Sequence, residues 1–419
     1  MAPTDLMAFD AAVQPSQQSL RALDWLNFLL AGALAGFGPF VAVYLAGQYW
    51  TQGEIGLILS ASGVAGLLSQ VPGGELLDVV RSKRSLVALG VAMIALSAGI
   101  LALWPSFPLV LTAAVVQGTT GGFLGSAVSA ISLGLVGHSA LPERLGRNQR
   151  FAAVGGFTTA GLMGVLAYYF SNQVIFFAAA AFAISTLFAL SKIRAADIHF
   201  ARACGAHSDC DHSAQPTRIA RGTVCSGYTL LVFAACIGLF QFANASILPL
   251  LGEAFGQDRR SPLVISALIL VPQVVVAALA PWVGRCADNW GRRPLLLLGF
   301  GALPIRAACF ALTRDPELLL AVQVLDGITG AAVGVLTPLV IADITKGTGR
   351  FNLAQGIVGT VSGIGASLST TATGLVAQSL GSAVGFVAVT GVALIALVTL
   401  WALLPETKPG PPLLATPAR

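Results

Sequence analysis

Long apolar runs, separated by short polar or charged breaks, fill almost all of this sequence. Each run is close to or above the ~20 residues with which a helix crosses the hydrocarbon core of a bilayer. A helix also satisfies its own backbone hydrogen bonds where water is absent, and the runs lack the alternation of membrane β-strands. The sequence therefore predicts an all-α membrane protein with twelve transmembrane helices. We place these at 24–46, 54–77, 85–104, 107–136, 150–171, 173–193, 224–251, 261–284, 294–312, 317–343, 352–380 and 382–404.

The composition excludes several classes of protein. Of the 419 residues, 56% are hydrophobic and only 10% are charged, whereas a soluble domain carries about 25% charged residues. A soluble enzyme, a nucleic-acid-binding protein and a disordered regulator are therefore excluded. The net charge of +5 does not indicate a nucleic-acid partner, because the positions of the basic residues along the chain explain it better.

The basic residues also predict the orientation. With twelve crossings both termini lie on one side of the membrane, and nineteen of the 23 Lys and Arg residues fall on that side. Because basic loops stay in the cytoplasm, we expect both termini to be cytoplasmic, in a bacterial inner (plasma) membrane. The longest break divides the chain into a tail, a six-helix bundle, a cytoplasmic linker, a second six-helix bundle and a second tail. These segments are 1–23, 24–193, 194–223, 224–404 and 405–419.

The two halves repeat each other. Gly74 and Asp78 after the second crossing match Gly284 and Asp288 after the eighth, at an offset of 210 residues. Gln117-Gly118 in the fourth crossing matches Asp326-Gly327 in the tenth, and Arg150-Phe151 echoes Arg350-Phe351. Parallel six-helix repeats are typical of transporters whose halves rock about a central site.

A short signature carries a family resemblance. Gly284 and Asp288 are followed by Gly291, Arg292 and Arg293, and a degraded copy places Gly74 and Asp78 before Arg81. With this signature the chain resembles the major facilitator superfamily over residues 24–404, in the form of a bacterial twelve-helix permease. The resemblance implies two pseudo-symmetric six-helix bundles and transport of a small molecule.

The signature has a physical interpretation as a gate. A carboxylate at a helix end can face the positive amino end of a helix in the other bundle, so Asp78 and Asp288 are predicted to latch the cytoplasmic side while the cavity opens outward. The neighbouring arginines can pair with carboxylates and with lipid phosphates. The alternative is that these loops carry only the basic charge of cytoplasmic loops.

Two charged residues lie deep in the predicted membrane core. Arg306 is about 18 Å from the cytoplasmic start of its helix and Asp326 about 14 Å from the outer start of the next, at 1.5 Å per residue, so we expect them within pairing reach. Intramembrane charges indicate function. Either Asp326 exchanges a proton in the cavity and is tuned by Arg306, or the two form a fixed salt bridge inside the C-terminal bundle.

The polar and aromatic residues of the cavity-lining helices are candidate substrate ligands. The family resemblance assigns this role to the first, fourth, seventh and tenth helices. The candidates are Asn27, Gln117, Thr120, Phe240, Gln241, Asn244 and Asp326. The alternative for an amide side chain is a hydrogen bond between helices. The seventh helix is expected to weaken near Pro249.

The predicted linker contains a cluster of cysteines and histidines, which are candidate metal ligands. Its residues are Cys204, His207, Cys210 and His212. Their spacing matches no standard zinc pattern, so we expect a solvated linker without a metal, and no cofactor. No ATP-binding Gly-x-x-x-x-Gly-Lys-Ser/Thr loop occurs.

These features predict a secondary transporter that moves a small organic solute by alternating access. We expect proton coupling, export in preference to uptake, lipid contacts and a monomer. The alternative is an uptake permease for a small metabolite or metal chelate; a transporter-like sensor and a membrane-embedded enzyme are more remote. Two departures from the pattern of the superfamily weaken an assignment as a multidrug antiporter. Ala114 stands where many proton-driven exporters of the superfamily have an arginine, and Gly155-Gly156 stands where drug/proton antiporters typically have a Gly-Pro pair.

Overall fold

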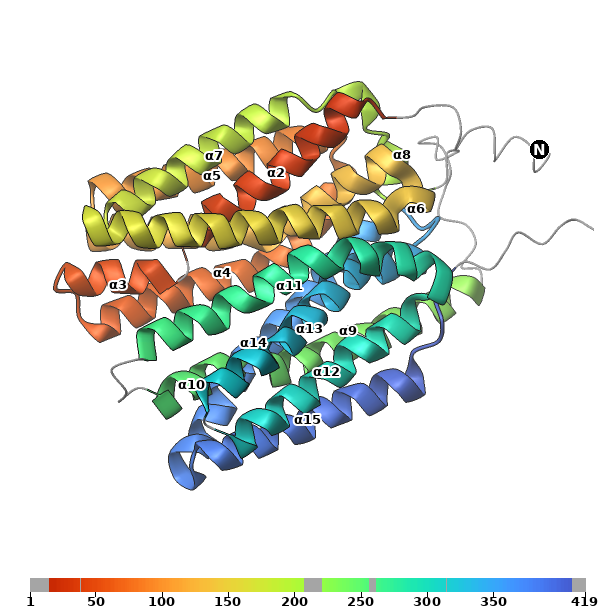
Figure 1. The fold of residues 1–419 in the computed structure, drawn as a ribbon. Coiled ribbons are helices and arrows are strands. Elements are labelled where there is room, and N and C mark those ends of the chain that lie inside the picture. Colours follow the sequence, from red (N-terminus) through yellow and green to blue (C-terminus); the bar gives the residue numbers. More distant parts are fainter. Residues whose placement is uncertain (1–14, 38, 207–220, 256–260, 314, 409–419) are drawn as a thin grey trace, which may run out of the picture.

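The computed structural model describes residues 15–37, 39–206, 221–255, 261–313 and 315–408. Its helices form two groups, which lie above and below one another in Figure 1. The N-terminal half contains α2 (Gln17–Ala35), α3 (Pro39–Gly47), α4 (Gln52–Val79), α5 (Lys83–Leu103), α6 (Phe107–Tyr169) and α7 (Val174–Ser191). The segment between the halves contains η1 (Ala195–Asp197) and α8 (Phe200–Ala203). The C-terminal half contains α9 (Arg221–Ala245), α10 (Ile247–Phe255), α11 (Ser261–Trp290), α12 (Arg292–Leu312), α13 (Pro316–Ile344), α14 (Phe351–Leu380) and α15 (Ser382–Leu403).

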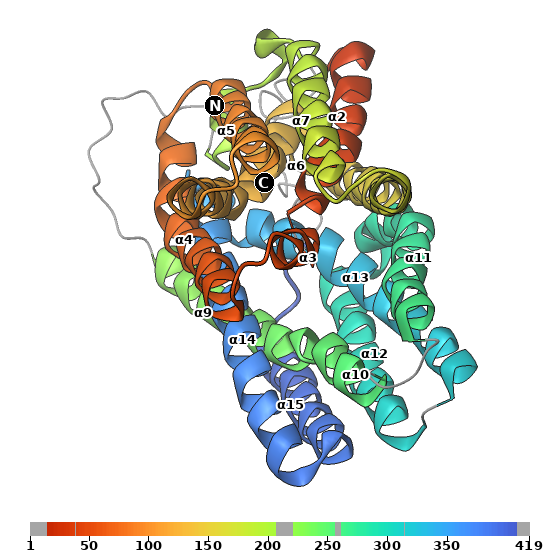
Figure 2. The same ribbon diagram turned by 90° about the vertical axis from the view of Figure 1, so that its left-hand side faces the viewer.

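The predicted all-α fold of twelve crossings in two six-helix bundles is confirmed. Among the described residues, 10 helical stretches are long and apolar enough to span a membrane. One of them, α6, is two helices that meet at Gly137, and α14 is a further helix of 30 residues. We attribute the lower hydropathy of α14 to its place between α4 and α9 (Figure 2), where Ser369 and Thr373 are buried and Gly356 and Gly365 approach the backbone of the two neighbouring helices.

The break between the fourth and fifth crossings is much shorter than predicted. A loop was expected over 137–149, but only Gly137 departs from helical geometry, with φ 70° and ψ −179°. Glycine adopts a positive φ without the steric cost that a side chain brings. The fifth crossing is therefore helical from 138 onward, and Arg150 lies inside a helix rather than at its start, unlike Arg350. The predicted match of Arg150-Phe151 with Arg350-Phe351 is wrong, because its offset is 200 residues rather than 210.

The first and seventh crossings are broken at matching places. Helix α2 ends at Ala35 and α9 ends at Ala245, and each end lies four residues before a proline, Pro39 and Pro249. In a continuous helix, the carbonyl oxygen four residues before a proline would have no N–H to accept from, and the proline ring would collide with it. Both pairs are related by the repeat offset of 210 residues. The predicted weakening near Pro249 is confirmed.

Each half has its own apolar core, and the halves touch mainly through two helix pairs, with further contacts of α6 to α13 and α14. One core comes from residues between Ala22 and Ile193. The other is mostly from the C-terminal half, with α6 residues such as Leu141 and Leu145 added. Helix α4 packs on α14 and α6 on α11, and the second pair lies side by side in both views (Figures 1 and 2).

The segment after α7 folds against one end of the molecule. We call this end, where α4 joins α5 and α11 joins α12, the basic end. The backbone N–H of His199 donates to Gly134 O at 3.1 Å, and that of Phe351 donates to Cys204 O at 3.1 Å. Residues 195–206 of the predicted linker therefore connect α6 to the start of α14, although we expected a solvated linker.

Candidate transport site

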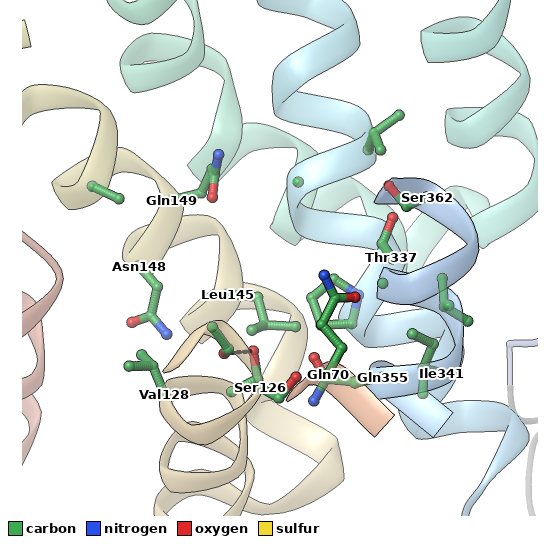
Figure 3. Close-up of a pocket in the computed structure, with 18 of the residues that line it drawn as sticks. Gln70, Ser126, Val128, Leu145, Asn148, Gln149, Thr337, Ile341, Gln355 and Ser362 are labelled. Carbon is green, nitrogen blue, oxygen red and sulfur yellow. Dashed lines mark hydrogen bonds between the residues drawn. The ribbon is translucent and has the colours of Figure 1, made fainter. Parts of the chain in front are cut away.

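A cavity of about 610 Å³ lies between the two halves. Helices α2, α4 and α6 line it from one half and α9, α13 and α14 from the other. Its polar lining consists of amide and hydroxyl side chains (Figure 3): Asn27, Gln70, Ser126, Ser129, Asn148, Gln149, Gln241, Thr337, Gln355 and Ser362. None of the described lining residues is an acid, a base or a histidine. The cavity therefore offers hydrogen bonds without a formal charge.

Two glutamines from opposite halves leave hydrogen-bonding groups unused in this cavity. Gln70 comes from α4 and Gln355 from α14, and they lie near one another in Figure 3. Gln70 Oε1 and Gln355 Nε2 are buried and have no hydrogen-bond partner among the described residues. A buried polar atom without a partner costs about 1–3 kcal/mol. Neither atom is exposed to the cavity in this conformation, so a solute could bind the two groups only if the side chains rotate.

Of the seven predicted substrate ligands, Asn27 and Gln241 line the cavity. Three of the others turn into their own bundles. Gln117 Oε1 accepts from Ser62 Oγ at 3.0 Å, Thr120 Oγ1 donates to Val116 O at 2.8 Å, and the Phe240 ring packs on Phe300 with centroids 4.7 Å apart. Asn244 and Asp326 bind Arg306 instead.

Most of the lining was not among the predicted substrate ligands. The lining also includes Gln70, Gln149, Gln355, Thr337 and Ser362, most of which come from helices outside the predicted cavity-lining set. A glutamine inside an apolar run was the available signal for Gln70 and Gln355. The facing direction of each helix was not available, because it depends on how the helices pack.

The predicted pairing of the two deep charges is confirmed. Arg306 Nη1 lies 2.5 Å from Asp326 Oδ1 and also donates to Asn244 Oδ1 at 2.9 Å. Arg306 Nε donates to Gln323 Oε1 at 3.0 Å. The guanidinium is buried, whereas the Asp326 side chain keeps 22% exposure. This network joins α9, α12 and α13 inside the C-terminal half, outside the cavity lining.

The helix α9 links the charged pair to the cavity. Asn244, which binds Arg306, lies three residues after Gln241, which lines the cavity. Residues three apart share one face of a helix. A change in the charge of the pair therefore has a short structural path to the cavity wall.

At the basic end, Asp78 of α4 contacts the amino end of α14, as predicted. Its Oδ1 accepts from the N–H of Asn352 at 3.1 Å and from Asn352 Nδ2 at 2.8 Å. Its Oδ2 accepts from the N–H of Leu353 at 2.9 Å. Gly74 permits the approach, because a Cβ there would lie 2.3 Å from Asn352 O.

The prediction that Asp288 makes the equivalent contact with the other half is wrong. Asp288 pairs with Arg292 of its own half at 3.3 Å, and its side chain is 48% exposed. The residue at the position of Asn352 in the other half is Pro142, which has no N–H to donate. Pro142 also stands inside the helical run of α6 rather than in a first turn, and the next residue, Glu143, brings a like charge.

The remaining signature residues of the second copy fasten α12 within its own half. Gly291 has φ 95° and precedes α12, where Glu406 Oε1 accepts from the N–H of Arg292 at 2.8 Å. Glu406 Oε2 accepts from the N–H of Arg293 at 3.1 Å. Arg292 Nε donates to Asp343 Oδ2 at 2.9 Å. Arg81 of the first copy lies in the turn between α4 and α5.

The described part of the chain holds no cluster of three or more metal ligands. Cys204 is buried, where its Sγ donates to Asp78 O at 3.2 Å and accepts from Lys83 Nζ at 3.3 Å. Burial raises the pKa of the Cys204 thiol, which disfavours the thiolate that binds metals. The other three candidates, His207, Cys210 and His212, lie outside the described residues.

Comparison with known proteins places this architecture. The profile described as Major Facilitator Superfamily matches residues 23–206 and 230–418. An uncharacterized MFS-type transporter of Mycobacterium tuberculosis is 35% identical over 392 residues, covering 92% of this chain and 93% of that protein. The tetracycline resistance protein, class B, of Escherichia coli is 37% identical over 87 residues, 21% of each chain.

Solved structures show the same fold. The proton:xylose symporter XylE aligns with a TM-score of 0.72 and 15% identity, over 93% of this chain and 97% of that one. The human organic anion transporter MFSD10 aligns with a TM-score of 0.69 and 16% identity, over 93% and 100%. Two bundles around an interfacial cavity, a signature at the basic end and a profile match across both halves lead to one conclusion. The chain belongs to the Major Facilitator Superfamily of membrane transporters.

Proposed function

We propose that this protein is a proton-driven exporter of a small, uncharged, hydrogen-bonding organic solute, working as a monomer by alternating access. The observation that carries the substrate class is the cavity, whose described lining has hydrogen-bonding groups and no ionisable side chain. A charged solute would be buried there without a counter-ion, which is costly. A neutral solute can hydrogen-bond to the amide and hydroxyl side chains of the lining, and to the unpaired groups of Gln70 and Gln355 once these side chains rotate.

The arrangement of the halves supports alternating access. Their closest backbone approaches lie toward the basic end, where Gly74 meets Asn352 and Gly284 meets Pro142. Toward the other end of α4, Gly53, Gly56 and Gly63 have no atom within 4 Å of a Cβ position. With the basic end in the cytoplasm of a bacterial inner membrane, this conformation faces outward.

The Arg306–Asp326 pair supports proton coupling. Protonation of Asp326 removes its negative charge and leaves Arg306 with its amide partners, Gln323 and Asn244. Because Asn244 and Gln241 share a face of α9, the change reaches the cavity wall. The partial exposure of Asp326 supports proton exchange, whereas a fixed salt bridge needs none.

Export is supported by short stretches that resemble resistance proteins. Besides the tetracycline resistance protein, the multidrug resistance protein fnx1 of Schizosaccharomyces pombe is 31% identical over 138 residues, 33% of this chain and 25% of that one. The departures at Ala114 and Gly155-Gly156 favour a narrower substrate range than that of a multidrug antiporter.

The test is transport of a library of neutral and charged solutes in inside-out and right-side-out vesicles, with and without a pH gradient. We expect uptake of neutral solutes into inside-out vesicles when the interior is acidic, and loss of gradient-driven transport in Asp326→Asn. Glu317→Gln, an exposed carboxylate at the start of the same helix, is the matched control. Proton-driven uptake into right-side-out vesicles would instead identify the permease alternative. If Asp326→Asn still transports solute when a pH gradient is applied, the Arg306–Asp326 pair of the wild type is a fixed salt bridge and does not couple protons to transport.

A further inference from the structure

A second cavity, of about 640 Å³, lies on the flank of the molecule near the basic end. Helices α2 and α6 of one half and α11 of the other line it. These three helices run along one flank in Figure 2. We call this cavity the flank pocket. It is separate from the central cavity, with which it shares no lining residue.

The flank pocket is basic. Arg147 and Arg150 of α6 and Arg285 of α11 line it together with one carboxylate, Glu143, so the lining carries a formal charge of +2. Arg147 shares the carboxylate of Asp24 with Arg144, and the Asp24 oxygens lie 2.6 and 3.0 Å from the Arg147 guanidinium. Among the described residues Arg150 forms no ion pair, and Arg285 donates only to Pro281 O of its own helix, at 3.4 Å. Both guanidinium groups are exposed.

Apolar rings complete the flank pocket. Trp25 is 56% exposed and stacks edge-on with Phe28, with centroids 5.6 Å apart. The Arg147 guanidinium lies 5.8 Å from the centre of the Phe151 ring. Arg285 is five residues, or about 8 Å, from the end of α11, which is the depth of lipid headgroups. Basic groups beside exposed aromatic rings at this depth suit a phospholipid, with its phosphate on the arginines and its chains along the rings.

The flank pocket exists only while the two halves meet at the basic end. Gly146 of α6 and Ala280 of α11 approach so closely there that a Cβ on Gly146 would lie 2.5 Å from Ala280 O. Separation of α6 from α11 would carry Arg285 away from Arg147 and Arg150. A ligand that bridges these arginines therefore binds one conformation better than the other and shifts the population toward it.

The pseudo-symmetric interface between α4 and α14 has no such set of residues. At the repeat offset of 210, Glu75 stands in the place of Arg285, Thr360 in the place of Arg150 and Ile357 in the place of Arg147. That interface instead has the Asp78 latch. The three arginines thus occur at the interface where Asp288 forms no latch with the other half.

We propose that the flank pocket binds the headgroup of an anionic phospholipid of the cytoplasmic leaflet, which closes the α6–α11 side of the basic end. The lipid supplies the negative charge that bridges Arg150 and Arg285, in place of a protein latch. Anionic lipid then stabilises the conformation in which the basic ends of the halves meet.

The first test measures lipid retention. The purified protein is exchanged into phosphatidylcholine nanodiscs that contain phosphatidylglycerol, and retained lipids are counted by native mass spectrometry. The variant Arg150→Gln/Arg285→Gln should bind phosphatidylglycerol roughly thirtyfold more weakly, because each basic residue near an anionic surface contributes about a fivefold factor. The control Arg21→Gln/Arg194→Gln makes the same charge change at exposed positions outside the pocket and should retain it.

The second test measures conformation in the same discs. The distance between labels at the exposed positions Lys192 and Asn289, on opposite halves at the basic end, is recorded with and without phosphatidylglycerol. Phosphatidylglycerol should raise the fraction with short distances in the wild type and in the control, but not in the pocket variant. Equal lipid retention or equal distance shifts in both double variants would overturn the proposal. So would competition by inorganic phosphate at millimolar concentration, which would assign the site to a soluble anion. Neither test measures transport, so failure here is distinct from failure of the proposed function.

Discussion

The two interfaces between the halves share one backbone geometry and differ in their chemistry. Gly74 meets Asn352 and Gly284 meets Pro142, with Cβ positions 2.3 and 2.4 Å from the facing carbonyl oxygens. All four residues obey the repeat offset of 210. Only the first interface ends in a carboxylate on free backbone N–H groups. Internal duplication therefore preserves shape more strictly than it preserves the interactions that hold the shape closed.

The cause of this difference is a single structural shift. Helix α14 begins at Phe351, so the N–H groups of Asn352 and Leu353 lie in its first turn, where they have no intrahelical partner. In the other half the helix already begins after Gly137, which leaves Pro142 and Glu143 inside it. Asp288 accordingly finds no free donors and pairs with Arg292.

The largest expected effect tests the shared geometry. Gly74→Val and Gly284→Val should each reduce transport more than tenfold, because either side chain meets backbone oxygen and keeps the basic end apart. Transport rates in vesicles and the Lys192–Asn289 label distance measure this. Gly56→Val, at a glycine of α4 with open space around it, is the control. A strong effect at only one of the two interfaces would show that their close approach is not equivalent.

A smaller effect tests the difference in chemistry. Asp78→Asn should shift the conformational equilibrium about tenfold away from the closed basic end, since the amide lacks one of the two accepting oxygens and the charge on the helix dipole, and a hydrogen bond to a charged group is worth about 1.5–3 kcal/mol. Asp288→Asn should shift it less than twofold. The label distance distribution at the basic end measures both. Equal shifts would restore the symmetric pair of latches.

The smallest effect concerns the substrate contacts of the two halves. Gln70→Leu and Gln355→Leu should each weaken solute binding about five- to tenfold, because each removes one hydrogen-bonding group from the cavity. Gln117→Leu should leave affinity within twofold, since Gln117 bonds to Ser62 within its own half. Titration of a transported solute by calorimetry measures these changes. A larger loss of solute affinity in Gln117→Leu than in Gln70→Leu would indicate that the solute binds inside the N-terminal bundle.

The sequence was informative where the physics is local. Helix length and apolarity predicted the crossings, and the rise per residue predicted that Arg306 meets Asp326. The signature and the charge of Asp78 at a helix end predicted its contact with the amino end of a helix in the other bundle. The first two predictions needed only positions along neighbouring helices, and the third needed the family resemblance as well.

The rest required the relative rotation of the helices. Gln117 and Gln241 looked alike as polar residues in apolar runs, yet only Gln241 faces the cavity. The repeat predicted a latch at Asp288 because it aligned the acids without aligning the amino ends of the opposite helices. The flank pocket was not predicted, because its arginines come from helices far apart in sequence.

The central claim is that the two halves move relative to one another across the α4–α14 contact during every transport cycle. Leu67→Cys/Gly363→Cys places thiols across the contact between α4 and α14, where a Cβ on Gly363 would lie 3.6 Å from Leu67 Cγ. Transport by this variant is measured before oxidation, after oxidation and after reduction, with the oxidised wild type as control. The account predicts that the disulfide stops transport and that reduction restores it. Undiminished transport by the cross-linked protein would contradict it.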